Sequence, residues 1–303
     1  SKAAWLAATA FASYADDTET MLDTKCWKDH WSSFGEIQKF KTIYDAGTHT
    51  KAYIMKTDNY VTINVRGTDG EFDFGKVRNC CLFNRKCDEL PLNWQTNCDY
   101  WKDDTVPCPD GVDYDELDDY NYWNDDTSDC WAHGGFWDAY QALLSKGLVS
   151  EVKKIIGSTK PEVYVTGHSL GGAVATFIAF DFSLFRDIEI NGLYTFGSPR
   201  VYGVKTRTRY EDARTFPAWR SAFGNDPVPL LPSDAAQGYR HIGVEIHAEG
   251  TSTCDSEDEP LYARKSSREF GDGTGKDGDL SNDEGIWNYD MCDHTGPAYL
   301  VMH

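Results

Sequence analysis

The sequence has few basic residues and no long hydrophobic run. Its 303 residues include 29 Lys and Arg against 49 Asp and Glu, which gives a formal net charge of −20. A general nucleic-acid binder needs a cationic surface to displace counterions from phosphates, so this charge excludes that class of protein. No apolar stretch approaches the roughly 20 residues that cross a bilayer, so no transmembrane segment is predicted.

The negative charge is concentrated in two parts of the chain. Residues 99–129, the first acidic block, hold 12 acids and one base, and residues 249–293, the second acidic block, hold 13 acids and four bases. Their net charges of −11 and −9 account for the whole −20, so the rest of the chain is balanced. A halophilic protein would spread its acids along the whole chain, whereas this pattern indicates two acidic surface insertions.

The cysteines lack metal-binding spacing. No Cys-x-x-Cys pair and no Cys/His alternation of the zinc-finger kind occurs, so disulfides in a secreted protein are favoured over a zinc site, and no metal or cofactor is expected. The odd count leaves at least one thiol free or paired with another chain. The chain also lacks an Asn-x-Ser/Thr sequon for N-glycosylation. The nine cysteines are Cys26, Cys80, Cys81, Cys87, Cys98, Cys108, Cys130, Cys254 and Cys292.

Hydrophobic periodicity predicts several elements outside the acidic blocks. Residues 3–15 are typical of an amphipathic helix, an interpretation in which any signal peptide is already removed. Residues 51–67 read as a hairpin broken at Asp58-Asn59, and helical spacing runs from Phe136 to Ile156. The segment from Gly70 to Cys130 has no periodicity and is predicted to be a long disulfide-tied excursion without regular structure.

The middle of the chain alternates strand and helix signals. A β-branched run at 163–167 is followed by an apolar helix at 168–180 and a second strand at 192–199, which predicts a βαβ unit and a parallel sheet. Residues 239–247 read as a further strand. Residues 200–220 are expected to be irregular, with a basic run on a solvated face; its members are Arg200, Arg207, Arg209 and Arg214.

The sharpest chemical signal is a G-x-S-x-G sequence between the predicted strand and helix. Gly167 and Gly171 flank Ser169, and such a turn lifts a serine hydroxyl clear of the sheet edge, where it can act as a nucleophile. The backbone N–H of Leu170, at the start of the helix, then points to where an oxyanion would form. The alternative is a tight β-to-α turn with a capping serine.

The chain resembles the class 3, fungal-type lipases of the α/β-hydrolase superfamily. The resemblance rests on several motifs: GHSLGGAVA (167–175), TFGSPRV (195–201), NDPVPLLP (225–232), GYRHIGVE (238–245), VRGT (65–68) and HGGF (133–136). It spans about residues 65 to 245 and a C-terminal His motif, and leaves both acidic blocks outside. It implies an α/β-hydrolase with a mostly parallel central sheet flanked by helices and a disulfide-rich acidic insertion near a lid. We therefore expect one domain over 1–303, with insertions at about 70–130 and 249–285.

A serine nucleophile needs a base and an orienting acid, in the chain order Ser, Asp, His. Asp226 stands in NDPVPLLP, where the resembling family carries its acid, and Asp234 is the fallback. For the base, His294 in CDHTGPAYL matches the family's final Asp-His motif. His241 is expected to be structural because it lies in a strand pattern; His247 and the terminal His303 are the remaining candidates.

The resemblance also implies a second oxyanion donor and a lid. Thr68 occupies the position after Arg-Gly in VRGT where the family donates a backbone N–H, and the alternative is a turn that ends a strand. The lid would begin directly after Thr68. Because both acidic blocks connect to the catalytic end of the sheet, we also expect an acidic rim around the active-site entrance.

These residues predict a secreted serine carboxyl-ester hydrolase, with a triacylglycerol lipase as the first expectation. The substrate would be an acylglycerol at a lipid–water interface, reached by peripheral contact, and the enzyme is expected to be a monomer without a nucleic-acid partner. A feruloyl-type esterase and a phospholipase A1 are the alternatives on the same fold. A non-catalytic binding protein that retains the fold is the alternative from another class.

Overall fold

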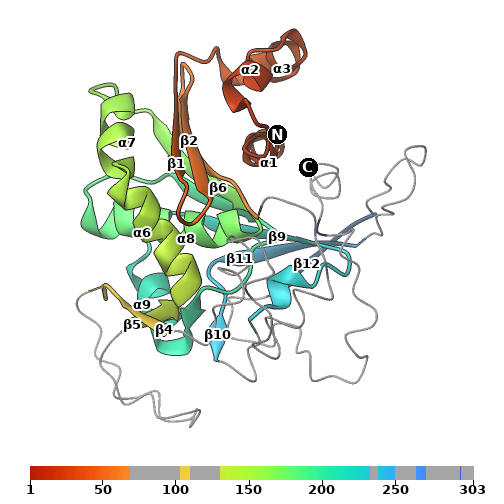
Figure 1. Ribbon diagram of the computed structural model, residues 1–303. Coiled ribbons are helices and arrows are strands. Elements are labelled where there is room, and N and C mark those ends of the chain that lie inside the picture. Colours follow the sequence, from red (N-terminus) through yellow and green to blue (C-terminus); the bar gives the residue numbers. More distant parts are fainter. Residues whose placement is uncertain (69–102, 110–129, 233–237, 250–263, 271–293, 295–303) are drawn as a thin grey trace.

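The computed structural model describes residues 1–68, 103–109, 130–232, 238–249, 264–270 and 294 (Figure 1). The expected lid, the acidic rim, Asp234 and His303 lie outside these residues. So do all the cysteines except Cys26, Cys108 and Cys130.

The described chain begins with three helices, continues with five strands, and mixes helices and strands from α6 onward. The helices are α1 (Lys2–Ala12), α2 (Thr18–Leu22), α3 (Lys25–Trp31), α6 (Gly134–Ser145), α7 (Leu148–Ile156), α8 (Leu170–Phe185) and α9 (Val204–Ala213), with 3-10 turns η1 (Ser32–Phe34) and η3 (Val228–Leu230). The strands are β1 (Lys39–Asp45), β2 (Thr50–Lys56), β3 (Tyr60–Val65), β4 (Asp103–Val106), β5 (Cys130–His133), β6 (Glu162–His168), β7 (Gly192–Phe196), β8 (Tyr202–Gly203), β9 (Ala218–Phe223), β10 (Tyr239–Arg240), β11 (Val244–Glu249) and β12 (Arg264–Phe270).

A mixed sheet forms the centre of the molecule. Within the described residues it has eight strands in the order β1-β2-β3-β6-β7-β9-β11-β12. The pairs from β3 through β11 are parallel, and the outer pairs β1–β2, β2–β3 and β11–β12 are antiparallel. The predicted hairpin at Asp58-Asn59 and the βαβ unit β6–α8–β7 are therefore confirmed, and the fold is that of an α/β-hydrolase. Strand β1 was not predicted.

Helices cover both faces of this sheet (Figure 1). Along β3, the alternate residues Val61, Ile63 and Val65 join one large apolar cluster with the buried side of α8 and with α6 and α7. On the other face α1 packs against β6 and β7, and its Trp5 and Leu6 join a second cluster with Tyr164 of β6. We call these the α8 face and the α1 face of the sheet.

Two predicted helices differ in detail from the structure. The predicted helix from Phe136 to Ile156 is two helices, α6 and α7, because Gly147 adopts φ 85°, a left-handed conformation that ends the first helix. The N-terminal helix is confirmed as α1, but it is buried along most of its length rather than on one stripe, since helices α2 and α3 follow it over the same face (Figure 1).

The prediction for residues 200–220 is wrong. The segment contains β8, helix α9 and β9, and β9 is a parallel strand of the central sheet. Its arginines are not a solvated face: Arg200 is 1% exposed and Arg207 is 8% exposed. Both guanidinium groups are buried because they donate hydrogen bonds to backbone carbonyls, Arg200 to Pro232 O at 2.9 Å and Arg207 to His241 O at 3.1 Å.

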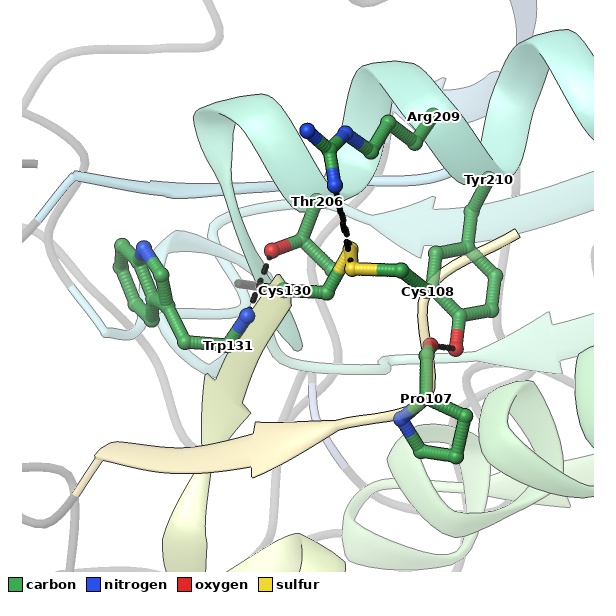
Figure 2. Close-up of a disulfide and its surroundings, with 7 residues drawn as sticks. All are labelled: Pro107, Cys108, Cys130, Trp131, Thr206, Arg209 and Tyr210. Atoms are coloured by element: carbon green, nitrogen blue, oxygen red, sulfur yellow. Dashed lines mark hydrogen bonds between the residues drawn. A yellow bond between two sulfur atoms is a disulfide. The ribbon is translucent and has the colours of Figure 1, made fainter. Parts of the chain in front are cut away.

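A disulfide joins the two described parts of the cysteine-rich segment. Cys108 and Cys130 are bonded, with 5.4 Å between their Cα atoms, beside the antiparallel strands β4 and β5 (Figure 2). The expectation of no regular structure between Gly70 and Cys130 is therefore wrong at β4. Figure 2 also shows Arg209 of α9 turned toward the disulfide, where its Nη1 lies 3.1 Å from Cys108 Sγ. Cys26 is an exposed free thiol.

Candidate active site

Four chain segments meet at the carboxyl edge of the parallel strands. Thr68 follows β3, Ser169 follows β6, Gly197 follows β7 and Asp226 follows β9, and these strands are neighbours in the sheet. Because parallel strands all end at the same edge, residues far apart in the sequence are collected in one place. The sheet order thus explains why the predicted site residues come from four separate motifs.

The predicted nucleophile occupies a strained turn. Ser169 has φ 56° and ψ −132°, a conformation that costs a non-glycine residue on the order of 1–3 kcal/mol, and it caps the N-terminus of α8. The turn is held closed by glycine: a Cβ on Gly171 would lie 2.2 Å from Val65 O, so α8 could not approach β3 this closely with any side chain there. The strain and the close helix–strand contact are the geometry predicted for a serine nucleophile.

The predicted acid and base are in direct contact. Asp226 Oδ2 lies 2.8 Å from His294 Nδ1, and both residues are buried, Asp226 at 6% and His294 at 8% exposed. The second carboxylate oxygen, Oδ1, accepts the backbone N–H of Val228 at 2.9 Å, which fixes the orientation of the carboxylate. Because a carboxylate only accepts, Nδ1 of His294 carries the proton, and Nε2 is left as the basic nitrogen.

Gly197 connects the serine turn to this acid–base pair. The backbone N–H of Ser169 donates to the carbonyl of Phe196 at 2.9 Å, so the serine lies beside the end of β7. The next residue, Gly197, has φ 56°, and a Cβ there would lie 2.9 Å from both His294 Nδ1 and Asp226 Oδ2. A glycine is therefore required for the imidazole and the serine turn to approach the same strand end.

The two predicted oxyanion donors, Leu170 and Thr68, belong to two segments that meet at Ser169. Leu170 is the first residue of α8, where a backbone N–H has no intrahelical acceptor and the helix dipole favours negative charge. On the other side, a Cβ on Gly67 would lie only 3.1 Å from Ser169 Cβ, so the residue directly before Thr68 approaches the nucleophile closely. The structure thus brings the segments of both residues to the serine, one after the end of β3 and one at the start of α8.

Arg200 and His241 hold the loop that carries Asp226 by hydrogen bonds to its backbone carbonyls. Besides its bond to Pro232, Arg200 donates from its backbone N–H to Leu231 O at 2.7 Å. His241, 4% exposed, has Nε2 2.6 Å from Pro229 O, in line with the structural role expected for it. For His247, another candidate base, Nδ1 lies 3.8 Å from Glu245 Oε1.

The sequence interpretation did not identify the residue before the nucleophile as part of the site. His168 Nε2 lies 2.8 Å from the backbone carbonyl of His294, and its Nδ1 lies 2.8 Å from the hydroxyl of Tyr14, just beyond α1. The rings of His168 and His294 are 4.6 Å apart. Burial, together with the nearby His294, lowers the pKa of His168 well below its usual 6.5. The available signal was the strand alternation, which places His168 on the α1 face.

Among the described residues, no group of three or more His, Cys, Asp or Glu side chains is arranged to hold a metal ion. No described helix has the length and apolar composition to cross a membrane.

A parallel sheet with a serine at a strand–helix turn, followed in the chain by an Asp and a His that bond to each other, is typical of the α/β-hydrolase fold. The family described as "Lipase (class 3)" matches residues 92–236. This range contains Ser169, Leu170 and Asp226 but neither Thr68 nor His294, and it runs through the first acidic block, which we had expected to lie outside the resemblance. The match covers 145 of the 303 residues, just under half of the chain, and shows that this part is similar to the class 3 lipases.

Curated relatives carry lipase names. A secreted mono- and diacylglycerol lipase 1 of Fusarium solani is 40% identical over 123 residues, which are 40% of this chain and 35% of that protein. A secreted mono- and diacylglycerol lipase A of Penicillium cyclopium is 36% identical over 117 residues, 38% of this chain and 37% of that protein. The chain therefore spans about a third of the length of these relatives.

Solved lipase structures share the fold. A fungal lipase–inhibitor complex superposes with a TM-score of 0.61 at 21% identity, over 99% of this chain and 94% of the other. Lipase II from Rhizopus niveus superposes with a TM-score of 0.55 at 22% identity, over 86% of each chain. At these identities the likeness concerns the fold alone.

Proposed function

We propose that this protein is a secreted serine carboxyl-ester hydrolase that acts on acylglycerols. The observation that carries the proposal is the 2.8 Å bond between Asp226 and His294, on the same strand end as the strained Ser169 turn. The carboxylate sets the imidazole tautomer, and that tautomer leaves a basic nitrogen for the serine hydroxyl.

In the first half of the reaction, Ser169 Oγ attacks the ester carbonyl carbon while His294 Nε2 takes the hydroxyl proton. The carbonyl oxygen becomes an oxyanion, which accepts hydrogen bonds from the backbone N–H groups of Leu170 and Thr68. Collapse of this intermediate breaks the bond to the alcohol, and His294 returns the proton to the leaving oxygen. The product is an acyl-enzyme on Ser169.

In the second half, water attacks the acyl-enzyme with His294 as the base. The same two donors hold the second oxyanion, and collapse releases the fatty acid and restores Ser169. Asp226 stays ionised throughout and stabilises the imidazolium form of His294. None of these steps requires a cofactor.

The substrate class rests on the relatives. Their names specify secretion and mono- and diacylglycerols, and a further relative, from Ricinus communis, is named a triacylglycerol lipase at 30% identity over 128 residues. We therefore place acylglycerols first, with triacylglycerols as the leading member. The enzyme acts as a monomer that contacts the lipid–water interface peripherally.

The test is covalent labelling of Ser169 by alkyl phosphonate esters, read by mass spectrometry of the peptide that contains residues 167–175. Long-chain and short-chain reagents are run in parallel, followed by hydrolysis of mono-, di- and triacylglycerols, a phospholipid and a feruloyl ester. We expect one phosphonate on Ser169, faster labelling by the long chain, and turnover of acylglycerols.

Ser169→Ala is the control for the labelling experiment. It should take no label and lose on the order of 10⁶-fold in kcat, as serine hydrolases do without their nucleophile. An unlabelled wild type, or full turnover by Ser169→Ala, would falsify the enzymatic proposal and favour a binding protein. Preference for the feruloyl ester or the phospholipid would instead reassign the substrate.

A further inference from the structure

The hydrogen bonds of His168 connect two parts of the molecule that the proposed reaction does not otherwise link. On one side the ring contacts the hydroxyl of Tyr14, and on the other it contacts the backbone carbonyl of His294, the predicted base. The three residues are 154 and 126 positions apart along the chain. His168 thus lies between the N-terminal segment and the backbone of the base.

The partners determine which nitrogen of His168 carries the proton. A backbone carbonyl only accepts, so Nε2 must be protonated and donate to His294 O. His168 is 5% exposed, and its lowered pKa keeps the ring neutral near pH 7, so Nδ1 is unprotonated and accepts from the hydroxyl of Tyr14. Tyr14 therefore selects the tautomer in which His168 can hold His294.

The position of this contact matters because His294 has two tasks. Its Nδ1 is bonded to Asp226, and in the proposed reaction its Nε2 must reach Ser169, so a small rotation of the backbone would disturb both. The carboxylate holds the ring from the side-chain end, and the bond from His168 holds the same residue at its backbone. Displacement of a catalytic group by about 1 Å can lower a rate by about 10²-fold.

We propose that His168 is a positioning residue for the base, and that Tyr14 sets its tautomer. His168 touches neither the ester nor the reacting atoms; it acts by donating Nε2–H to the carbonyl of His294. This inference rests on the proposed function for its kinetic consequence, but the effect on the Asp226–His294 hydrogen bond is independent of any substrate.

Three variants separate this role from packing. His168→Phe keeps a ring but removes the donor, and its kcat should fall by about 10²-fold with little change in KM. His168→Gln restores an amide donor near Nε2 and should recover much of that loss. Tyr14→Phe removes only the hydroxyl that sets the tautomer, and its kcat should fall by about 10-fold.

Tyr53→Phe is the matched control. Tyr53 of β2 is fully buried, and its hydroxyl donates to Thr9 O, so this variant also removes one hydroxyl between the sheet and α1. Among the described residues, no hydrogen bond of Tyr53 leads to His294. Its free energy of unfolding should therefore fall at least as far as that of Tyr14→Phe, while its kcat stays at the wild-type value.

The deciding measurement is the downfield proton resonance of His294 Nδ1–H, recorded by NMR on protein with ¹⁵N-labelled histidine. We expect it to shift or broaden in Tyr14→Phe and His168→Phe and to stay in place in Tyr53→Phe. An unchanged resonance in both variants, with kcat equal to that of Tyr53→Phe, would overturn the inference. If His168→Phe does not fold, Tyr14→Phe and His168→Gln carry the test. A wild type that neither hydrolyses esters nor takes phosphonate would refute the proposed function instead, while the resonance still decides the positioning role.

Discussion

The two faces of the central sheet differ in chemistry although they share the same strands. On β3, Val61, Ile63 and Val65 point to the α8 face, where the buried cluster is almost entirely aliphatic and aromatic. The intervening Thr62 and Asn64 point to the α1 face and are fully buried there, with Asn64 Nδ2 donating to Thr62 Oγ1 at 2.8 Å. The α8 face buries mostly apolar area, whereas the α1 face buries, beside its own apolar cluster, polar groups that must find partners.

This difference assigns separate tasks to the two faces. Burial of apolar area is nondirectional and stabilises the fold in proportion to that area. Buried hydrogen bonds contribute less net free energy, but their geometry is specific. We infer that the α8 face mainly holds the sheet together, while the α1 face, through Tyr14 and His168, mainly fixes where the base lies.

Among the substitutions that test this comparison, we expect the largest loss of kcat at the hydrogen-bonded pair of Asp226 and His294. Asp226→Asn keeps an oxygen for the N–H of Val228 but offers an amide to His294, so the imidazole adopts the wrong tautomer. We expect kcat to fall by about 10⁴-fold. Steady-state ester hydrolysis measures it, and a loss below 10-fold would exclude Asp226 as the acid.

A substitution on the α8 face should show the opposite pattern. Ile63→Ala removes a fully buried side chain from β3 and should lower the free energy of unfolding by about 2–5 kcal/mol. Urea denaturation measures this loss. At denaturant concentrations below the unfolding transition, kcat should remain at the wild-type value. A large fall in kcat would mean that the α8 face also positions the base.

The buried histidines should make the fold sensitive to mild acid. The pKa values of His168 and His241 are both well below 6.5, chiefly because of burial. Below pH 6.5 the unfolded chain binds protons that the folded protein does not, so stability falls as the pH falls. Each histidine contributes up to about 1.4 kcal/mol per pH unit.

Denaturant unfolding at several pH values between 6.5 and 5 checks this slope. Above pH 6.5, His168 and His241 should cause no change in the free energy of unfolding with pH. His241→Gln should reduce the slope by about half of the two-histidine contribution. A stability that does not change over this window in the wild type would contradict the neutral state assigned to both rings.

The smallest effect is expected at the exposed end of the α1 face. Lys2 of α1 lies 3.0 Å from Glu162 of β6, but their side chains are 34% and 51% exposed, so solvent screens the pair. Lys2→Met should cost about 0.2–1 kcal/mol of unfolding free energy, less in high salt, with kcat unchanged. Thermal unfolding at two salt concentrations measures it, and a larger loss would mean that the contacts of Lys2 Nζ with the rings of Tyr60 and Tyr164, at 4.9 and 4.5 Å, also stabilise the fold.

The sequence alone predicted those features whose signals lie close together along the chain. Ser169 was predictable because strand, turn and helix signals are adjacent in the chain, and the apolar all-round pattern predicted that α8 is buried. Asp226 and His294 were predicted from chain order and the family resemblance. Their contact is confirmed as geometry across 68 residues, whereas their catalytic roles stay predictions.

The failures come from interactions that sequence periodicity does not contain. Arg200 and Arg207 were predicted to be exposed because charged side chains usually are. Their guanidinium groups are instead buried, and they donate hydrogen bonds to backbone carbonyls that are distant in the sequence. Because this segment, residues 200–220, is rich in arginine, α9 and β9 were not predicted. The link from Tyr14 to His168 joins segments 154 residues apart, so only the folded chain reveals it.

We infer that the α1 face positions the base while the α8 face supplies stability. The most direct test measures kcat and the free energy of unfolding on Tyr14→Phe and Ile63→Ala side by side. We predict that Tyr14→Phe loses about 10-fold in kcat with about 1 kcal/mol or less of stability, while Ile63→Ala loses about 2–5 kcal/mol with kcat unchanged. If activity follows stability in the same way for both variants, the two faces do not differ in function and the claim is contradicted.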